Sequence, residues 1–353
     1  MLENFSKKNI LVKLVYPQRG SLDFSKETFI NFYNVKYPFE IIQLAHKLPF
    51  NYLNYFEKIS FILSSFIWSL YSVKKVMKNI SINEILMTRT HWILFFLSKY
   101  KNLIIYECHK YSKINNFVFK RLSNKDNILI IFTNKKLKES FVLSNTLAKQ
   151  SIILESSFEE RLFKDFSTYG HKKKNKVVFV GQLLRFNKSR DLKFIIDAFG
   201  EKELENFELN IIGGPNSAIE FLKVNTSRNV KFLGHISNIE AIKEMESAEI
   251  GILINDQNNH SLIHTSPIKY YEYLRAGLKI LAVDFESHKN LPLKENIYYF
   301  KYKNLKSFKN SLLYAHKEKY IENAELQKFS YEYRVNKLIN HIARLEGLEP
   351  PTL

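Results

Sequence analysis

Short apolar runs alternate along the chain with stretches whose apolar residues recur at helical spacing. Leu192, Ile195 and Phe199 show that spacing clearly, and Ser189 is expected to cap their helix. Strands are predicted at Ile10–Val15, Phe39–Leu44, Glu84–Thr88, Leu103–Tyr106, Ile128–Phe132, Ser151–Leu154, Val177–Val180, Phe207–Ile212, Val230–Leu233, Ile250–Ile254 and Lys279–Val283. Strands that alternate with helices in this way indicate an α/β protein with parallel, doubly wound sheets.

Capping residues place two further helix ends. Ser237 and Glu240 have the spacing of a capping box. Ser266 is expected to cap a helix whose first residue is Pro267, because the N–H that proline lacks has no partner at that position. Gly277 is expected to end this helix, since glycine readily adopts the left-handed backbone conformation.

The length of 353 residues is enough for two domains of ordinary size. A polar, basic stretch, His171–Lys176, separates two halves with the same alternation and is predicted to be an interdomain linker and hinge. We therefore predict an N-terminal domain over residues 1–170 and a C-terminal domain over residues 171–325. Leu305–Lys317 and Glu322–Leu345 are predicted to be terminal helices, followed by a loose tail.

The chain is strongly basic, with a formal net charge of +18. Residues 1–170 hold 25 Lys and Arg against 13 Asp and Glu, so most of the excess lies in the first half. Such charge favours nucleic acid or an anionic membrane as a partner, or is simply a solvated lysine-rich surface. The lysines are scattered and no nucleic-acid motif accompanies them, so we expect no nucleic-acid partner.

The cellular location is predicted from cysteine use and hydrophobicity. Cys108 is the single cysteine, which excludes an internal disulfide and fits a reducing compartment. Met1–Lys8 is too polar for a signal peptide. Ile59–Val73 is apolar but interrupted by serines, and it is shorter than the ~20 residues of a membrane span, so a buried or interfacial helix is expected. We predict a cytoplasmic protein that is at most peripheral on the inner face of the membrane.

Candidate ligand-binding residues follow the strands, because open parallel sheets bind ligands at the carboxyl ends of their strands. Gly181 follows one strand, and Gly213 and Gly214 follow the next; glycine lets a ligand approach the backbone closely. Arg185 and Lys188 lie in the loop after Gly181. Alone, these two residues would equally fit an ordinary solvated loop.

The segment Ser266–Gly277 carries the most specific signal. A helix that starts behind a strand end is a ready anion site. Glu272 would lie close to that anion, and a carboxylate suits sugar hydroxyls rather than phosphate. The plain alternative is an ordinary capped helix in an α/β domain.

Ser266–Tyr273 is similar to a Ser-Pro-x-Lys-x-x-Glu-Tyr core found in one branch of the retaining glycosyltransferases of the group-1 class, family 4. This resemblance implies the GT-B fold, in which two Rossmann-like, doubly wound domains face a cleft. It covers the C-terminal half well and the N-terminal half loosely. It also implies that a helix within residues 326–353 crosses back to the N-terminal domain.

The resemblance assigns roles to single residues. Glu272 matches the second of two glutamates in the family pattern, whereas His264 stands at the first, which is a departure. His109 follows a buried strand and resembles a family histidine that faces the donor sugar. Lys188 matches a lysine on the donor diphosphate. The family's arginine position is Gln182 here, and Arg185 is the candidate for the missing charge.

The implied catalytic residues are therefore His109, Lys188 and Glu272. The implied donor site consists of Gly181, Arg185, Lys188, Gly213, Gly214, His264, Ser266, Pro267, Ile268, Lys269 and Glu272. No metal site is expected, since the histidines are dispersed and His260–His264 is not clearly helical. The family requires no cofactor besides the nucleotide-sugar co-substrate.

The resemblance thus implies a metal-independent glycosyltransferase of the hexosyltransferase type. It would move a sugar from a nucleotide-diphosphate sugar to a glycan or lipid-linked acceptor in surface polysaccharide assembly, with retention. Two alternatives remain open. One is an inverting GT-B transferase. The other is a catalytically silent GT-B protein that binds sugar nucleotide or glycan, which the histidine at position 264 favours.

Overall fold

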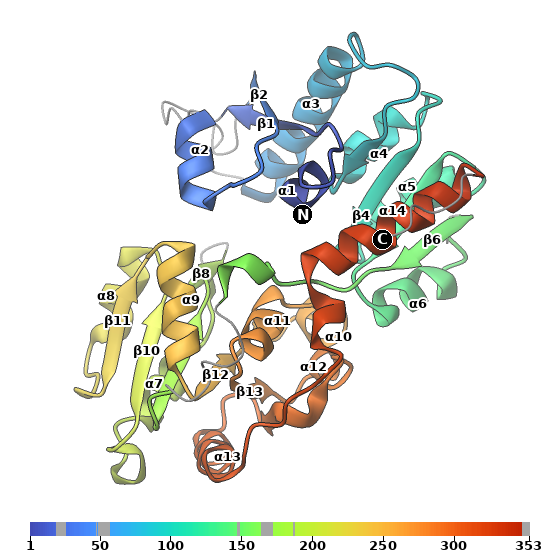
Figure 1. The fold of residues 1–353 in the computed structure, drawn as a ribbon. Helices are drawn as coiled ribbons and strands as arrows, with labels where there is room; N and C mark the ends of the chain where they lie inside the picture. Colours follow the sequence, from blue (N-terminus) through green and yellow to red (C-terminus); the bar gives the residue numbers. More distant parts are fainter. Residues whose placement is uncertain are drawn as a thin grey trace. The chain divides into compact units, whose positions relative to one another are not determined.

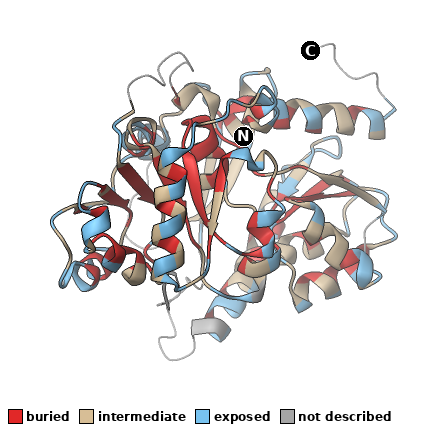
Figure 2. Ribbon diagram, turned by 90° about the horizontal axis from the view of Figure 1, so that it is seen from below, coloured by how far each residue is buried: buried red, intermediate tan, exposed pale blue. Residues whose placement is uncertain are grey.

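The computed structural model describes residues 1–18, 26–46, 48, 57–146, 149–163, 172–185 and 188–347, with the backbone alone at 32, 57, 58, 185, 188, 189 and 259. Its contacts divide the chain into an N-terminal unit, Met1–Glu155, and a C-terminal unit, Ser156–Leu353. Each unit is built on parallel sheets covered by helices, which confirms the predicted α/β fold (Figure 1). The sheet strands are largely buried, whereas the helices expose their outer sides (Figure 2).

The N-terminal unit holds two separate parallel sheets. In the first, β1 (Lys13–Gln18) pairs with β2 (Glu40–Ala45). In the second, the strands neighbour one another in sequence order: β3 (Leu86–Thr88), β4 (Ile104–Cys108), β5 (Ile128–Phe132) and β6 (Gln150–Ile153). The helices are α1 (Leu2–Ser6), α2 (Lys26–Tyr33), α3 (Glu57–Val76), α4 (His91–Leu97), α5 (Lys113–Leu122) and α6 (Lys135–Leu143). Every residue of β4 and β5 is buried, as expected for parallel strands with both faces covered.

The C-terminal unit contains one six-stranded parallel sheet. Its strands are β7 (Lys176–Val180), β10 (Glu208–Ile212), β11 (Val230–Gly234), β12 (Ile250–Leu253), β13 (Lys279–Val283) and β14 (Ile297–Phe300). They neighbour one another as β11-β10-β7-β12-β13-β14, which is the 3-2-1-4-5-6 order of a doubly wound dinucleotide-type fold. The strand order reverses between β7 and β12.

Helices and a hairpin complete this unit. The helices are α7 (Lys193–Ala198), α8 (Asn216–Lys223), α9 (Asn238–Ser247), α10 (Asn259–Ile263), α11 (Ile268–Arg275), α12 (Glu286–Lys289), α13 (Leu305–Lys317) and α14 (Tyr331–Leu345). The antiparallel hairpin joins β8 (Leu184–Arg185) to β9 (Lys188–Ser189). The predicted strand Lys279–Val283 and helix Leu305–Lys317 match β13 and α13 at both ends.

Of the three predicted helix caps, one is present and two are not. The capping box of Ser237 and Glu240 is present at the start of α9. The prediction for Ser189 was wrong, because that residue lies in β9 and Leu192 occupies the N-cap of α7 without a side-chain hydrogen bond. The prediction for Ser266 was also wrong, since Pro267 is the N-cap of α11 and its extended backbone leaves Ile268 as the first helical residue.

The basic stretch before β7 is bound to the C-terminal unit where it is described. His171 lies outside the described residues. The ammonium of Lys172 donates to the carbonyls of Ala248 at 2.9 Å and Ala276 at 2.7 Å, and Lys176 already belongs to β7. The domain boundaries at residues 170 and 325, and the crossing of the last helix to the N-terminal domain, stay predictions. Within the described ranges, no helix combines the length and hydrophobicity that crossing a bilayer requires.

Candidate functional site

The carboxyl ends of β7, β10 and β11 form a glycine-lined edge in the C-terminal unit. The Gly181 N–H donates to the Ile212 carbonyl at 2.9 Å, and the Gly213 N–H donates to the Gly234 carbonyl at 2.8 Å. Gly213 has a φ of +143°, and a Cβ there would lie 1.8 Å from the Gly181 oxygen. The two backbones can therefore lie this close only because position 213 has no side chain. The predicted residues Gly181, Gly213 and Gly214 are brought together here, since the Leu183 N–H also donates to the Gly214 carbonyl at 2.9 Å.

Arg190 is a basic residue at this edge that the sequence analysis missed. Its Nη1 would lie 3.3 Å from a Cβ on Gly181, and it donates to the Ile254 carbonyl at 3.4 Å. The guanidinium therefore spans the ends of β7 and β12, where the strand order reverses. Ligands bind at such switch points in open α/β sheets. Arg190 is therefore a further basic candidate beside the predicted Arg185.

The two predicted basic residues of the following loop lie on the hairpin. Arg185 in β8 and Lys188 in β9 are direct cross-strand partners. Their side chains are outside the described part of the chain, so their contact with a ligand stays a prediction. The Arg190 N–H donates to the Leu183 carbonyl at 3.1 Å, so the base of the hairpin adjoins the glycine-lined edge.

The start of α11 lies against the segment that opens the C-terminal unit. The Ser156 hydroxyl donates to the Ser266 carbonyl at 2.8 Å. The Ser266 hydroxyl oxygen is buried and has no hydrogen-bond partner among the described residues. Ser266 and Pro267 lead into α11, whose first residue is Ile268. Whether they touch a donor stays a prediction.

Tyr273 fixes α11 against the sheet. Its hydroxyl accepts from the Val180 N–H at 3.0 Å and donates to the Ile252 carbonyl at 3.3 Å, so one buried group ties α11 to β7 and β12. A Cβ at Gly251 would come within 2.8 Å of the Tyr273 ring, so glycine is required for this packing. The sequence contains the tyrosine, but its two backbone partners are distant in the chain and gave no signal.

Glu272, next to Tyr273, pairs with Lys269 one turn earlier on α11. The side chains are 14% and 30% exposed, so both partly reach the surface. Two predicted donor-site residues are therefore in direct contact. The carboxylate keeps acceptor capacity for further hydrogen bonds, because each of its oxygens has two lone pairs.

The end of α11 is as predicted and is firmly held. Gly277 has a φ of +69°, its N–H donates to the Leu274 carbonyl, and the Leu278 N–H donates to the Tyr273 carbonyl. This is a Schellman ending. Arg275, 3% exposed, donates twice to Glu160, with Nε–Oε1 at 2.8 Å and Nη2–Oε1 at 2.5 Å.

His264 occupies the C-cap of α10 and is 9% exposed. Burial lowers the pKa of its imidazole, so the ring is neutral at physiological pH. Its ring centroid lies 6.2 Å from that of His260. The expectation that this stretch is not clearly helical was wrong, because Asn258 caps a short helix by accepting from the Ser261 N–H. Whether His264 faces a donor sugar stays a prediction.

His109 belongs to a charged cluster at the carboxyl end of β4. Its Nε2 lies 3.2 Å from Oε1 of Glu107, whose other oxygen accepts from Arg89 Nε at 2.8 Å. The Glu107 side chain is 1% exposed, whereas those of His109 and Arg89 are 43% and 58% exposed. One buried carboxylate thus orients two accessible cationic or donor groups. Sequence reasoning placed His109 at this strand end but missed the roles of Glu107 and Arg89.

Cys108 is a packed residue and not a nucleophile. It is fully buried, and burial raises the pKa of its thiol to about 12. A thiol with that pKa carries almost no thiolate at neutral pH. For the part of the chain that the structure describes, no group of three or more His, Cys, Asp or Glu side chains has the arrangement of a metal site.

Comparison with known proteins supports the fold but gives no close relative. No protein-family model matches the sequence, and no curated protein matches it. Among solved structures, sucrose-phosphate synthase from Thermosynechococcus elongatus is similar with a TM-score of 0.68 and 13% identity, over 98% of this chain and 92% of that one. Alr3699/HepE from Anabaena, in complex with UDP and glucose, is similar with a TM-score of 0.60 and 12% identity, over 97% and 94%.

A third similar structure is the UDP-forming α,α-trehalose-phosphate synthase from Burkholderia xenovorans in complex with glucose-6-phosphate. Its TM-score is 0.58 with 11% identity, over 82% of this chain and 78% of that one. These neighbours are GT-B glycosyltransferases. At such low identity the likeness shows that the chain shares their fold.

Proposed function

We propose that this protein is a glycosyltransferase that moves a sugar from a nucleotide-diphosphate sugar to a glycan or lipid-linked acceptor in surface polysaccharide assembly. The supporting observation is the carboxyl edge of the C-terminal sheet. There the backbones of Gly181 and Gly213, the guanidinium of Arg190 and the helix that carries Glu272 adjoin the point where the strand order reverses. HepE has been solved with UDP and with UDP-glucose, so uridine nucleotides are the first ligands to test.

Each group at this edge has a chemical role in the proposal. Glu272 accepts hydrogen bonds from the ribose hydroxyls, and Lys269 shares its carboxylate. Arg190 and Lys188 hold the diphosphate together with backbone N–H groups near Ile268. Breaking the sugar–phosphate bond builds negative charge on the leaving phosphate, and fixed donors aimed at it stabilise the transition state. These cationic side chains make a protein-bound metal unnecessary, and we propose retention by the resemblance of Ser266–Tyr273 to the retaining class.

In the N-terminal unit, we assign His109 to the donor sugar. The exposed face of its imidazole is available because Glu107 holds the other side of the ring. A carboxylate on one nitrogen favours a proton on that nitrogen, which leaves the opposite nitrogen as an acceptor. His109 would then accept a hydrogen bond from a sugar hydroxyl.

The test is calorimetric titration of the whole chain with UDP, GDP and ADP, with and without chelator. A hydrogen bond to a charged group contributes about 1.5–3 kcal/mol, so Glu272→Ala should weaken nucleotide binding roughly ten- to a hundredfold. The matched control is Glu325→Ala, which removes a glutamate that pairs with Lys328 at the same i,i+3 spacing. Equal affinity in wild type and Glu272→Ala would remove Glu272 from the site.

Turnover gives a second measurement. Lys188→Ala should lower kcat by about 10²–10³, the usual loss for one donor to a growing charge, and should change nucleotide affinity less. The effect should be the same with and without added divalent metal. A Lys188→Ala protein with wild-type kcat would show that this lysine does not serve the leaving group.

A second candidate function is a catalytically silent protein of the same fold that binds sugar nucleotide. The observation in its favour is His264, a largely buried neutral imidazole at the position where the resembling family has a carboxylate. Donor hydrolysis separates the two functions. A protein that binds UDP-sugar but releases no sugar, with any acceptor or with water, would be a binder.

We also propose that the protein is peripheral on the inner face of the cytoplasmic membrane, where a lipid-linked acceptor would lie. The N-terminal unit carries 23 Lys and Arg against 10 Asp and Glu, and the C-terminal unit carries 30 against 25. The excess in the N-terminal unit supports attraction to anionic lipid. Sedimentation with anionic but not with neutral vesicles at low salt would support this location, and equal sedimentation with both would contradict it.

A further inference from the structure

The most deeply buried residues of helix α3 are mostly small and polar. The buried side chains on this helix, none more than 4% exposed, are Ser60, Ser64, Ser69, Ser72 and Val73. Two of these serine hydroxyls donate to backbone carbonyls, Ser64 to that of Leu48 at 2.8 Å and Ser69 to that of Ser65 at 2.7 Å. A surface helix of a globular protein ordinarily buries its apolar side and exposes its polar side. In α3 the arrangement is reversed.

Six large apolar residues of α3 are exposed, and five of them, which we call the α3 stripe, share one side of the helix; the sixth, Phe61, lies on another side. The stripe consists of Ile59, Ile62, Leu63, Phe66 and Leu70, and each is between 36% and 61% exposed. Their spacing of three, four, seven and eleven residues from the first places them on one face. Burying the exposed part of such side chains is favourable, and contiguous exposed apolar surface of this kind marks an interaction site.

Aromatic residues extend the stripe onto α4. The Phe66 ring lies edge-on to those of Trp92 and Phe96, with centroids 5.1 and 5.3 Å away. Of the two tryptophans of the chain, Trp92 on α4 adjoins the stripe, whereas Trp68 lies on the other side of α3 and stacks on His46 with ring centroids 5.3 Å apart. Tryptophan is favoured at the boundary between apolar and aqueous phases, because its ring is apolar and its N–H is polar.

Basic residues surround the same surface. Lys74 and Lys75 in the last turn of α3, and Lys78 just after it, are exposed. Across residues 57–101 the sequence has seven Lys and Arg against two Asp and Glu. A second copy of the chain would bring these lysines face to face and is opposed by their repulsion. An anionic lipid surface matches both the apolar stripe and the positive charge.

We propose that α3 lies in the interface of an anionic bilayer, with the α3 stripe among the acyl chains and Lys74, Lys75 and Lys78 at the headgroups. A helix with one apolar face and flanking lysines, too polar overall to span, is typical of interfacial helices. This inference deepens the proposed membrane location by naming the contact surface. It does not depend on glycosyl transfer.

The first experiment uses the two tryptophans of the whole chain as reporters. The protein is titrated with vesicles of phosphatidylcholine alone and of phosphatidylcholine mixed with phosphatidylglycerol. With the anionic vesicles, tryptophan emission should shift to shorter wavelength, and acyl-chain brominated lipid should quench it. Binding to anionic vesicles without shift or quenching would overturn the proposal for α3 and still leave a charge-driven membrane location.

Variants separate the stripe from general charge. Ile62→Ser with Leu70→Ser should weaken partition into anionic vesicles about tenfold, since two apolar side chains lose their insertion. The control is Phe221→Ser, which removes a 72% exposed apolar residue on α8. Lys74→Gln with Lys75→Gln should weaken it roughly thirtyfold at low salt. Lys120→Gln with Arg121→Gln, the basic pair in the last turn of α5, is its control.

Two results would overturn the proposal. One is equal partition of wild type and the Ile62→Ser, Leu70→Ser variant, with the circular dichroism of both intact. The other is a concentration-dependent dimer that the same variant abolishes, which would make the α3 stripe an interface between two copies of the chain. Loss of vesicle binding in the stripe variant alone, with the Phe221→Ser control unaffected, would support it.

Discussion

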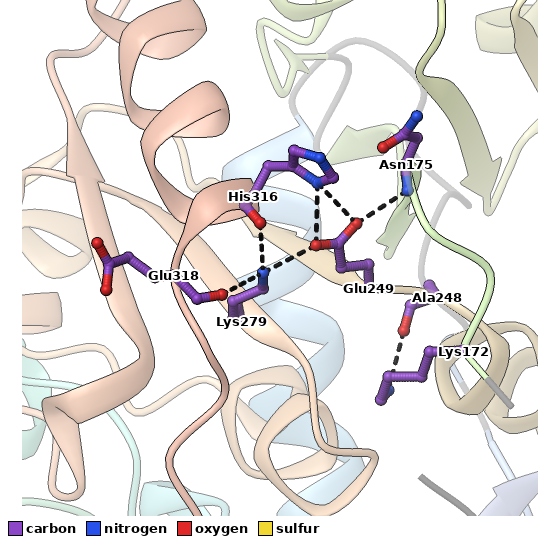
Figure 3. A network of polar contacts seen from close by, with 7 residues as sticks. All are labelled: Lys172, Asn175, Ala248, Glu249, Lys279, His316 and Glu318. Carbon is purple, nitrogen blue, oxygen red and sulfur yellow. Dashed lines mark hydrogen bonds and ion pairs between the residues drawn. The ribbon is translucent and has the colours of Figure 1, made fainter. Parts of the chain in front are cut away.

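The two edges of the six-stranded sheet differ in how their polar groups are used. At the amino edge, Glu249 accepts from Lys279 Nζ and from the Asn175 N–H, each at 2.8 Å, and lies 3.0 Å from Nδ1 of His316 (Figure 3). The ammonium of Lys279 also donates to the carbonyls of His316 and Glu318. The charged groups of Glu249 and Lys279 are therefore paired with other groups of the protein.

The carboxyl edge differs in its backbone and in one buried hydroxyl. Gly181 and Gly213 carry no side chains, and the Ser266 hydroxyl has no partner within the described ranges. The hydroxyl of Tyr273, also buried, holds α11 in place. The difference indicates that changes at the amino edge should alter stability alone, whereas changes at the carboxyl edge should alter ligand binding as well.

The largest expected effect comes from Gly213→Ala. The new Cβ would lie 1.8 Å from the Gly181 oxygen, and the φ of +143° disfavours any side chain, so the backbone must move. We expect the unfolding free energy to fall by about 4 kcal/mol and nucleotide binding to disappear. Denaturant unfolding and calorimetry measure the two effects.

The control for this change is Gly347→Ala, a glycine with a φ of +71° and no atom within 4 Å of its Cβ position. It should cost only about 1 kcal/mol of backbone strain. A Gly213→Ala protein that resembles this control would show that the close approach of the two strand-end loops is unimportant.

Glu249→Gln tests the amino edge. It removes the charge partner of Lys279, whose side chain is 6% exposed, so we expect a loss of about 3 kcal/mol in unfolding free energy. Nucleotide affinity of the folded protein should not change. Glu318→Gln is the control, because Glu318 contributes only its backbone carbonyl to the network. Altered nucleotide affinity in Glu249→Gln would break the contrast between the two edges.

The same carboxylate predicts a dependence on acid. Burial alone would raise the pKa of Glu249, but hydrogen bonds from Lys279 and Asn175 outweigh it and hold the pKa below its usual value. A carboxylate with a lowered folded-state pKa contributes stability that is present above its unfolded pKa and lost as the pH falls through the folded one. Unfolding curves below pH 5 should therefore show wild type approaching Glu249→Gln.

Tyr273→Phe sharpens the account of the carboxyl edge. It leaves the buried Val180 N–H without an acceptor, which costs about 1–3 kcal/mol, and it loosens α11. We expect nucleotide binding to weaken several-fold, because Glu272 loses its fixed position. Tyr270→Phe is the control: its hydroxyl contacts the Pro292 and Leu293 carbonyls, so it should lower stability without changing affinity. Equal affinity in both variants would show that Tyr273 has no positioning role.

The smallest effect concerns Lys172, also drawn in Figure 3. Burial lowers the pKa of this ammonium to about 7, although Glu246 and Glu249 favour the charged form. The unfolded chain therefore binds more protons than the folded one above that pH, and the unfolding free energy should rise with pH. Between pH 7 and 8 we expect about 1 kcal/mol, which Lys172→Met should abolish. A flat profile in wild type would indicate that the carbonyls keep the ammonium charged.

The parts of the fold that the sequence predicted are those set by local pattern. The four residues that follow Lys279 in β13 form a continuous apolar run, and the capping box of Ser237 and Glu240 depends only on residues three apart. Gly277 ended its helix as expected for the same reason. Such features need no information from distant parts of the chain.

The errors arose where the local structure depends on contacts with residues far away in the sequence. Ser189 looked like a cap, but its backbone pairs with Leu184 in the hairpin. Arg190 carried no signal because its position beside Gly181 and the Ile254 carbonyl follows from the strand order. The serines within Ile59–Val73 interrupt an apolar pattern in the sequence, but four of them are buried in the structure. The roles assigned to Glu272, Lys188, His109 and His264 stay predictions.

The pairing of Arg275 with Glu160 has a practical consequence for cutting the chain. A fragment that starts at residue 171 would contain β7 to α14 but lack Glu160, and it would leave a guanidinium that is 3% exposed without its carboxylate. It would also lack Phe158, whose N–H donates to Phe329 and whose carbonyl accepts from Tyr331. A fragment that starts before Ser156 retains both Glu160 and Phe158. The first residues to keep therefore lie ahead of β7 and belong to no strand of the sheet.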